Sequence, residues 1–163
     1  MKLRHPIPAI LFGLLLAGTA QAGDALVERG KYLAQIMDCA GCHMPRGKDG
    51  APILEAGLSG GNVGFEIPGL GIFWPPNLTP DATGLGAWSN EDIERALRTG
   101  ERPDGRALAP AMPWPSYAAL SPDDMQALVA YLKSLPKASS PTPEPVSDAS
   151  KAAAPFYRVT IPN

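Results

Sequence analysis

The feature that most constrains this chain is the five-residue motif Cys39-Ala40-Gly41-Cys42-His43. On a helical turn, positions i, i+3 and i+4 share one face, so Cys39, Cys42 and His43 can all address one planar group. C-x-x-C-H is the attachment signature of a c-type haem. A C-x-x-C pair alone is also typical of a redox-active dithiol, but that motif needs a βαβ context, and the residues before Cys39 have a helical pattern. We therefore predict one covalent haem c, with thioethers from both cysteines and His43 as the proximal iron ligand.

The amino-terminal residues have the pattern of an export signal. A short basic start with Lys2 and Arg4 precedes the apolar run 7–16, and Ala20-Gln21-Ala22 supplies small residues at the spacing of a cleavage site. We expect residues 1–22 to be a removed signal peptide, which would place the protein in the periplasm; an uncleaved anchor is the alternative. The apolar run is short for a membrane span, and we expect no transmembrane helix in the mature chain.

Cysteine use and charge narrow the function classes. The chain has two Cys, both inside the motif, so no structural disulfide is expected, and a covalent haem would stabilise a small exported domain instead. Lys and Arg number 14 against 16 Asp and Glu. This balance gives no support for nucleic-acid binding, which needs a basic surface.

The pattern along the chain predicts an all-α domain with modest helix content. Apolar periodicity and capping residues predict helices over 24–38, 89–99 and 121–135. The last is the clearest, because Ser121 can cap it and Pro136 follows its end.

Two segments are predicted to lack helix. The stretch between Gly47 and Pro80 is too long for a plain connector, and Pro68-Gly69 between two part-apolar runs predicts a short β-hairpin. Residues 137–155 are rich in Pro, Ser and Ala and are expected to be an extended linker, whereas Phe156 to Ile161 favour β-structure and would dock back. The expected organisation is a signal peptide (1–22), one domain (23–136) and a tail (137–163).

The second iron ligand follows from elimination. His5 and His43 are the only histidines, and His5 would leave with the signal peptide, so two histidine ligands from one mature chain are excluded. A methionine thioether suits electron transfer. The candidates are Met37, Met44, Met112 and Met125. The first two flank the motif too closely to reach the opposite haem face, and Met125 lies on the apolar stripe of the last helix. We predict Met112, in a stiff loop bracketed by prolines.

Two functions from different classes fit such a haem. With His43 and Met112 on the iron, the protein is an electron carrier and not an enzyme. The alternative is a haem enzyme or gas sensor with an open distal site, such as a peroxidase, but no mature histidine remains for the distal acid–base role. A binding module without haem is a third and weaker hypothesis.

Several further motifs together carry a family resemblance. They are Asn77-Leu78-Thr79-Pro80-Asp81, Thr83-Gly84-Leu85-Gly86 with Trp88-Ser89, Leu97-Arg98-Thr99-Gly100, Pro103-Asp104-Gly105-Arg106, Met112-Pro113-Trp114 with Tyr117, and Ala130-Tyr131-Leu132-Lys133-Ser134-Leu135-Pro136. With the C-x-x-C-H motif, they make residues 28–136 resemble class I cytochrome c, and more narrowly the cytochrome c domains that serve periplasmic alcohol, aldehyde and gluconate dehydrogenases.

The resemblance implies a fold, partners and further contacts. It implies a few helices around one haem, with the first and last helices crossing where Gly30 and Tyr131 would let them approach. It implies redox partners: a periplasmic dehydrogenase as donor and a downstream oxidase or cytochrome as acceptor. It also implies residues that would contact the haem propionates, for which the candidates are Asn77, Thr79, Trp88, Arg46 and Arg106. For the two arginines, a solvated surface charge is the alternative.

Overall fold

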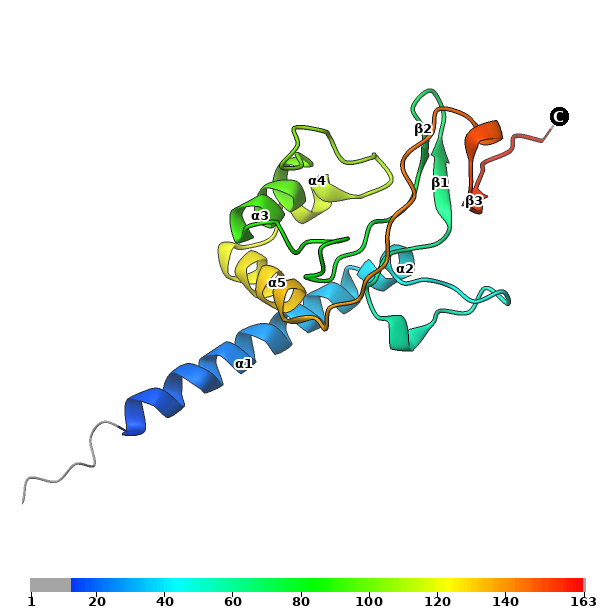
Figure 1. Cartoon of the computed structure of the whole chain (residues 1–163). Coiled ribbons are helices and arrows are strands. Elements are labelled where there is room, and N and C mark those ends of the chain that lie inside the picture. Colours follow the sequence, from blue (N-terminus) through cyan, green and yellow to red (C-terminus); the bar gives the residue numbers. More distant parts are fainter. Residues whose placement is uncertain (1–12, 163) are drawn as a thin grey trace, which may run out of the picture.

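A computed structural model describes residues 13–162 of the chain. Helices pack together at one end of the molecule and a small sheet lies at the other (Figure 1). The helices are α1 (Gly13–Ile36), α2 (Cys39–His43), α3 (Asn90–Thr99), α4 (Trp114–Tyr117) and α5 (Pro122–Ser134). The strands are β1 (Gly64–Ile67), β2 (Gly71–Phe73) and β3 (Phe156–Tyr157), and two short 3-10 turns span Leu54–Ala56 and Ala149–Lys151.

Helix α1 is longer than the sequence predicts. It begins at Gly13 rather than Asp24, so residues 13–22 of the predicted signal peptide form its first turns, while residues 1–12 lie outside the described part of the chain. None of the helices within residues 13–162 is both long enough and apolar enough to span a bilayer. The helix ends at Ile36, and Asp38 then adopts a left-handed conformation with φ of 53°, which redirects the chain into α2.

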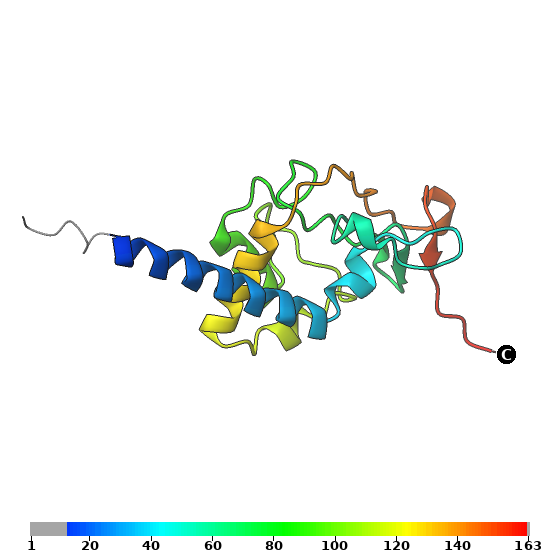
Figure 2. The same cartoon turned by 90° about the horizontal axis from the view of Figure 1, so that it is seen from below.

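The close approach of the first and last helices is confirmed. Helix α1 crosses α5 (Figure 2), and a Cβ atom added at Gly30 would lie 1.9 Å from the Ala127 backbone oxygen and 2.7 Å from Cβ of Tyr131. Only glycine permits this separation, and it lets Leu33 and Leu128 bury their side chains almost completely. At the same crossing, Arg29 Nε donates to Asp124 Oδ1 over 2.8 Å.

The predicted caps of α3 and α5 are confirmed. The Ser89 hydroxyl accepts from the Asp92 amide, the Asp92 carboxylate accepts from the Ser89 amide, and Gly100 ends the helix at φ of 73°. Ser121 accepts from the Asp124 amide over 3.1 Å at the start of α5. These residues satisfy amide groups that have no partner inside the helix.

The fold is not purely all-α, which corrects the predicted fold class. The hairpin is confirmed, because β1 and β2 pair antiparallel on either side of Pro68-Gly69. The third strand is β3, which pairs parallel with β1 and gives the order β2-β1-β3. The predicted docking of the β-favouring segment is confirmed for Phe156–Tyr157, but its partner β1 lies about ninety positions away along the chain, so local sequence does not predict the pairing.

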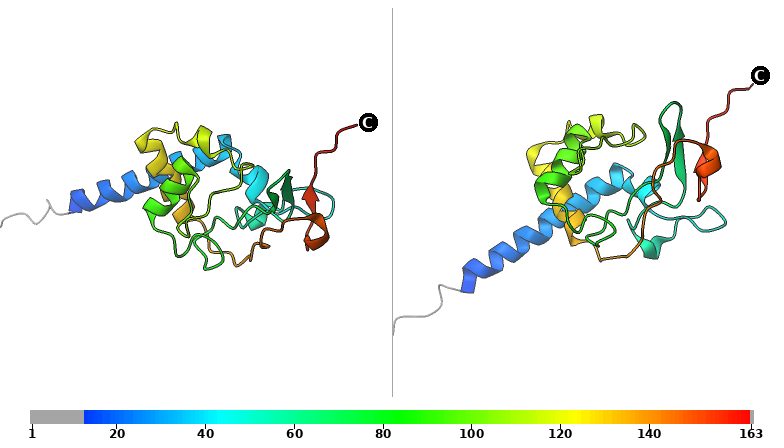
Figure 3. Two further views of the ribbon diagram at one scale, coloured as in Figure 1. Left: turned by 90° about the horizontal axis from the view of Figure 1, so that it is seen from above. Right: turned by 45° about the horizontal axis from the view of Figure 1, so that its top comes forward.

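The tail is extended, as predicted, but it is bound to the domain rather than a free linker. It leaves the end of α5 and runs past α2 to the strands (Figure 3). Val146 exchanges two backbone hydrogen bonds with Ile72, at 2.8 and 3.1 Å. The Pro155 carbonyl accepts from the Gly64 amide and from the indole of Trp74. The tail cannot fold alone, but buried donors of the domain need its carbonyl oxygens.

Candidate haem-binding site

The motif residues lie on the single turn of α2, which presents both sulfurs and the imidazole. Cys39 is partly buried, Cys42 is exposed, and both thiols are free. His43 is 5% exposed. The backbone after the motif is also packed tightly, since a Cβ atom at Gly61 would lie 2.1 Å from the Cys42 carbonyl oxygen. Because Gly61 has no side chain, the 59–61 segment can lie directly against α2.

The His43 ring is held by a backbone carbonyl. Its Nδ1 lies 2.7 Å from the Pro76 oxygen, and because a carbonyl can only accept, Nδ1 must carry the proton. The other ring nitrogen, Nε2, is then the lone-pair donor, which is the tautomer that an iron ligand requires. Burial lowers the pKa of His43, so the ring is held in the neutral form that can bind a metal.

The two thiols differ from those of a dithiol oxidoreductase. Burial raises the pKa of Cys39 to about 11, and burial also raises the pKa of Cys42. A reactive dithiol instead needs a lowered thiol pKa. Two free sulfurs and a neutral, correctly protonated imidazole on one turn fit the attachment of a haem c.

The four candidate methionines lie in different surroundings. Met112 is partly buried, follows a turn in which its amide donates to the Ala109 carbonyl over 2.9 Å, and packs against the main apolar core. Met125 is 0% exposed inside that core. Met37 packs at its edge beside the motif, and Met44 is half-buried directly after His43. Assignment of Met112 as the distal ligand stays a prediction.

Of the propionate candidates, Asn77 and Thr79 form one buried polar cluster together with Thr83. Asn77 is 0% exposed and Thr79 is 3% exposed. Asn77 Nδ2 donates to Thr83 Oγ1 over 3.0 Å, and Asn77 Oδ1 accepts from the Thr79 amide over 2.9 Å. The tail completes the cluster, because Asn77 Nδ2 also donates to the Ala138 carbonyl over 2.7 Å.

The other three propionate candidates lie apart from this cluster. Trp88 is partly buried against the core, with the Arg102 guanidinium 5.5 Å from its ring centre. Arg46 lies beside the motif, where its guanidinium donates to the carbonyls of Gly41 and Gly50.

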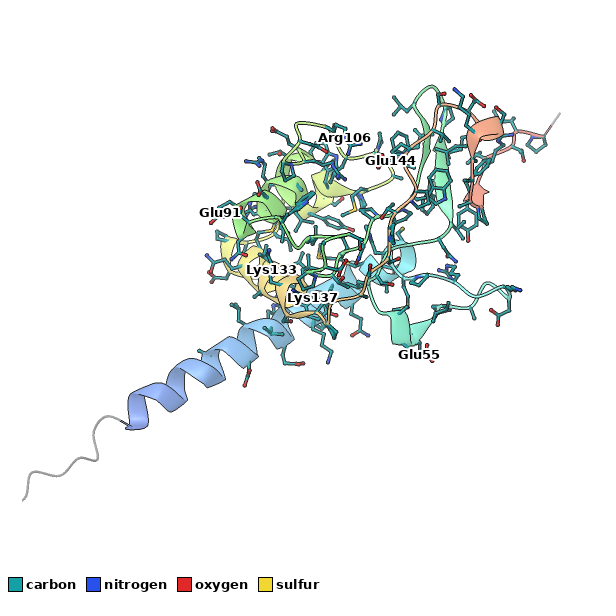
Figure 4. The ribbon with its side chains drawn as sticks, in the orientation of Figure 1. Glu55, Glu91, Arg106, Lys133, Lys137 and Glu144 are labelled. Atoms are coloured by element: carbon teal, nitrogen blue, oxygen red, sulfur yellow. The ribbon has the colours of Figure 1, made fainter. Side chains whose placement is uncertain are left out.

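Arg106 is exposed on a tight turn and pairs with Asp104 at 2.9 Å. Asp104, followed by Glu144 of the tail, raises the pKa of this guanidinium, and Figure 4 shows Arg106 and Glu144 side by side. Contact of the five candidate residues with the haem propionates stays a prediction.

Sequence reasoning missed Pro76 and the tail residues that support it. Pro76 carries no side-chain donor or acceptor, so no motif marks it, and its role is visible only once the chain is folded. The sequence marks Tyr117 only as part of a motif. In the fold its hydroxyl donates to the Met37 carbonyl over 3.3 Å, and burial raises its pKa to about 12.

Comparison with known sequences agrees with this site. Residues 27–136 match the family described as Cytochrome c. The chain belongs to the cytochrome c family. Membership of this cytochrome family implies covalent haem c and a part in electron transport, and it covers the motif, Met112 and all helices from α2 to α5.

Several relatives of this cytochrome are cytochrome subunits of dehydrogenases. It is 45% identical over 112 residues to the gluconate 2-dehydrogenase cytochrome c subunit of Pantoea cypripedii, covering 68% of this chain and 23% of that protein. It is 38% identical over 124 residues to the cytochrome c subunit of the quinone alcohol dehydrogenase of Gluconacetobacter polyoxogenes (76% and 25%). It is 37% identical over 131 residues to the fructose dehydrogenase cytochrome subunit of Gluconobacter japonicus (73% and 25%). The chain thus spans about a quarter of the length of these relatives.

Proposed function

We propose that this cytochrome is a single-haem electron carrier that accepts electrons one at a time from a dehydrogenase and passes them to a downstream oxidase or cytochrome. The sequence holds one C-x-x-C-H motif and no other cysteine, which supports one haem c. The dehydrogenase partner is supported by the relatives, whose names describe cytochrome subunits of gluconate, alcohol and fructose dehydrogenases.

The observation that carries the proposal is the hydrogen bond from His43 Nδ1 to Pro76. It leaves Nε2 as the lone-pair donor of a buried, neutral ring, beside two free sulfurs on the same turn. Cys39 and Cys42 would hold the haem through thioethers, with His43 and Met112 as the two iron ligands. The haem would supply reversible one-electron chemistry, and two protein ligands would leave no coordination position for a substrate.

The proline-bracketed loop supports Met112 as a ligand. Prolines at 110 and 113 restrict the backbone on both sides, and the Met112 carbonyl accepts from the Trp114 amide over 2.9 Å. A thioether is a weak ligand, so a rigid loop that holds the sulfur in place favours its binding. Periplasmic location is supported by the export pattern of residues 1–22, and mass measurement of the mature amino terminus, expected at Gly23, tests it.

Spectra and redox titrations of three variants test the ligand assignment. Met112→Ala should lose the methionine–iron charge-transfer band of the oxidised protein. Met112→His should lower the potential by more than about 59 mV, the shift that changes a one-electron equilibrium tenfold. Met125→Ala is the matched control and should keep the band. A Met112→Ala protein with the wild-type band would show that another residue is the ligand, and peroxide turnover by the wild type would favour the open-site alternative.

A further inference from the structure

The tail contacts the domain at the peptide group that orients His43. The carbonyl of Pro76 and the amide of Asn77 belong to the same peptide bond, which is planar and rigid. At one end of this group the carbonyl accepts from His43 Nδ1 over 2.7 Å. At the other end the amide donates to Oγ1 of Thr142 over 3.4 Å. Thr142 of the tail and His43, the predicted iron ligand, therefore bond to opposite ends of the same planar peptide group.

Further hydrogen bonds join the tail to the Asn77 side chain and to Thr79 and Thr83. The Ala138 carbonyl accepts from Asn77 Nδ2 over 2.7 Å and lies 3.2 Å from the hydroxyl of Thr79. The Ser140 amide donates to Thr83 Oγ1 over 3.0 Å. Because Asn77 is 0% exposed, its amide group has no route to bulk water and depends on these partners.

We propose that residues 138–142, here called the tail strap, position His43 through the Pro76–Asn77 peptide group, with Thr142 as the positioning residue. This inference rests on the proposed function, in which His43 binds the haem iron. An N–H that donates a hydrogen bond polarises its own peptide group and makes the attached carbonyl a better acceptor. A better acceptor on Nδ1 raises the basicity of the imidazole as a ligand, which stabilises oxidised iron.

The proposal extends beyond the part of the chain that the family accounts for. The family match ends at residue 136, and the strap begins two residues later. The protein therefore tunes its proximal ligand with a segment outside its cytochrome domain. This also replaces the linker interpretation of residues 137–155 with a specific role for their first few residues.

The test compares two substitutions at position 142 in the full-length, haem-loaded protein. Thr142→Val keeps the shape but removes the oxygen, and Thr142→Ser keeps the oxygen. Thr142→Val should raise the potential, shifting the one-electron equilibrium severalfold and at most about tenfold, or 59 mV. It should also speed solvent exchange of the His43 Nδ1 proton, followed by NMR. Thr142→Ser should restore both values towards wild type.

The controls separate this proposal from the proposed function. Thr160→Val makes the same chemical change at an exposed residue beyond β3 and should alter neither the potential nor the proton exchange. If Thr142→Val carries normal haem but leaves both measurements unchanged, the strap does not position His43. If the wild-type protein attaches no haem at all, the proposed function is wrong, and this result is seen in the absorbance spectrum before any variant is made.

Discussion

The two halves of this protein are held together by different forces. The helical half, made of α1, α3, α4 and α5, is stabilised by apolar burial, with side chains such as Met125 and Leu128 removed from water. The loop half, made of residues 44–88 and the tail, has fewer buried apolar side chains than the helical half, although Ile72 is fully buried. It is also held by hydrogen bonds to buried polar groups, including Asn77 and the indole of Trp74. The haem motif lies where the two halves meet (Figure 1).

A small protein with two such halves gains stability from a cofactor bound at their junction. Apolar burial gives the helical half cooperative stability, but hydrogen bonds contribute only about 1 kcal/mol each after desolvation is counted. A haem bonded to Cys39 and Cys42 on α2, and ligated by His43 and Met112, would join this junction to the loop before α4 through the iron.

Loss of both thioethers at the junction between the two halves should have the largest effect on stability. The double variant Cys39→Ala, Cys42→Ala loses both thioethers, and the protein has no disulfide to replace them. We expect the melting temperature to fall by about 10–20 °C, or cooperative melting to be lost, if covalent haem contributes about 5 kcal/mol. Calorimetry checks this, and unchanged melting would mean that the haem has no structural role.

Truncation of a core side chain should strongly weaken the helical half. Met125→Ala should lower the free energy of unfolding by about 2–5 kcal/mol, because Met125 is fully buried and leaves a cavity. Gln126→Ala, exposed on the same helix, should change stability by less than about 0.5 kcal/mol. Denaturant titration of both proteins provides the comparison, and equal effects would contradict a packed core at α5.

Loss of the Asn77 side chain, which bonds to several partners, should lower the free energy of unfolding by less than the core truncation does. Asn77→Ala removes the donor to Ala138 and the acceptor of the Thr79 amide, which should cost about 1–3 kcal/mol. Asn62→Ala is the control, since Asn62 is exposed and bonds to the Arg46 backbone, where water can replace it. A similar loss in both variants would show that burial of Asn77 is unimportant.

The helix crossing should respond to a single methyl group. At Gly30 a Cβ atom would lie 1.9 Å from backbone, so the overpacking in Gly30→Ala should outweigh the helix propensity of alanine and destabilise by about 1–2 kcal/mol. Gly23→Ala in the same helix meets nothing within 4 Å and should be neutral or stabilising. Thermal melts of the two full-length variants test this contrast, which fails if Gly30→Ala is the more stable protein.

Acid should weaken the pairing of β3 with β1, and this is the smallest of the expected effects. Arg158 pairs with Glu66, with Nη2 2.8 Å from Oε1, and this hydrogen bond lowers the pKa of Glu66 from its usual 4.5. A lowered folded-state pKa means that the contribution is present above about pH 4.5 and is lost as pH falls through the folded value. Amide exchange of Phe156 and Tyr157 should therefore become faster, relative to α5, as pH drops from about 5 to 3 once intrinsic rates are corrected. Glu66→Gln should abolish this pH dependence.

Much of the molecule was determined by local sequence. The C-x-x-C-H spacing places three chemical groups on one helical turn, Ser89 and Ser121 cap their helices, and Pro68-Gly69 turns the hairpin. Each of these features depends on residues within about one or two turns of each other, so their spacing alone predicts the geometry. The crossing at Gly30 was also expected, but from the family resemblance.

The surroundings of the motif depend on contacts between segments that lie far apart along the chain. The acceptor for His43 is a backbone carbonyl 33 residues away, and Thr142, which bonds to the same peptide group, lies 65 residues beyond Asn77. The third strand and the binding of the tail likewise depend on contacts between distant segments. Backbone carbonyls are chemically alike in every residue, so the sequence does not indicate which one will accept from a histidine. The acceptor depends on which carbonyl the folded chain brings next to the buried donor.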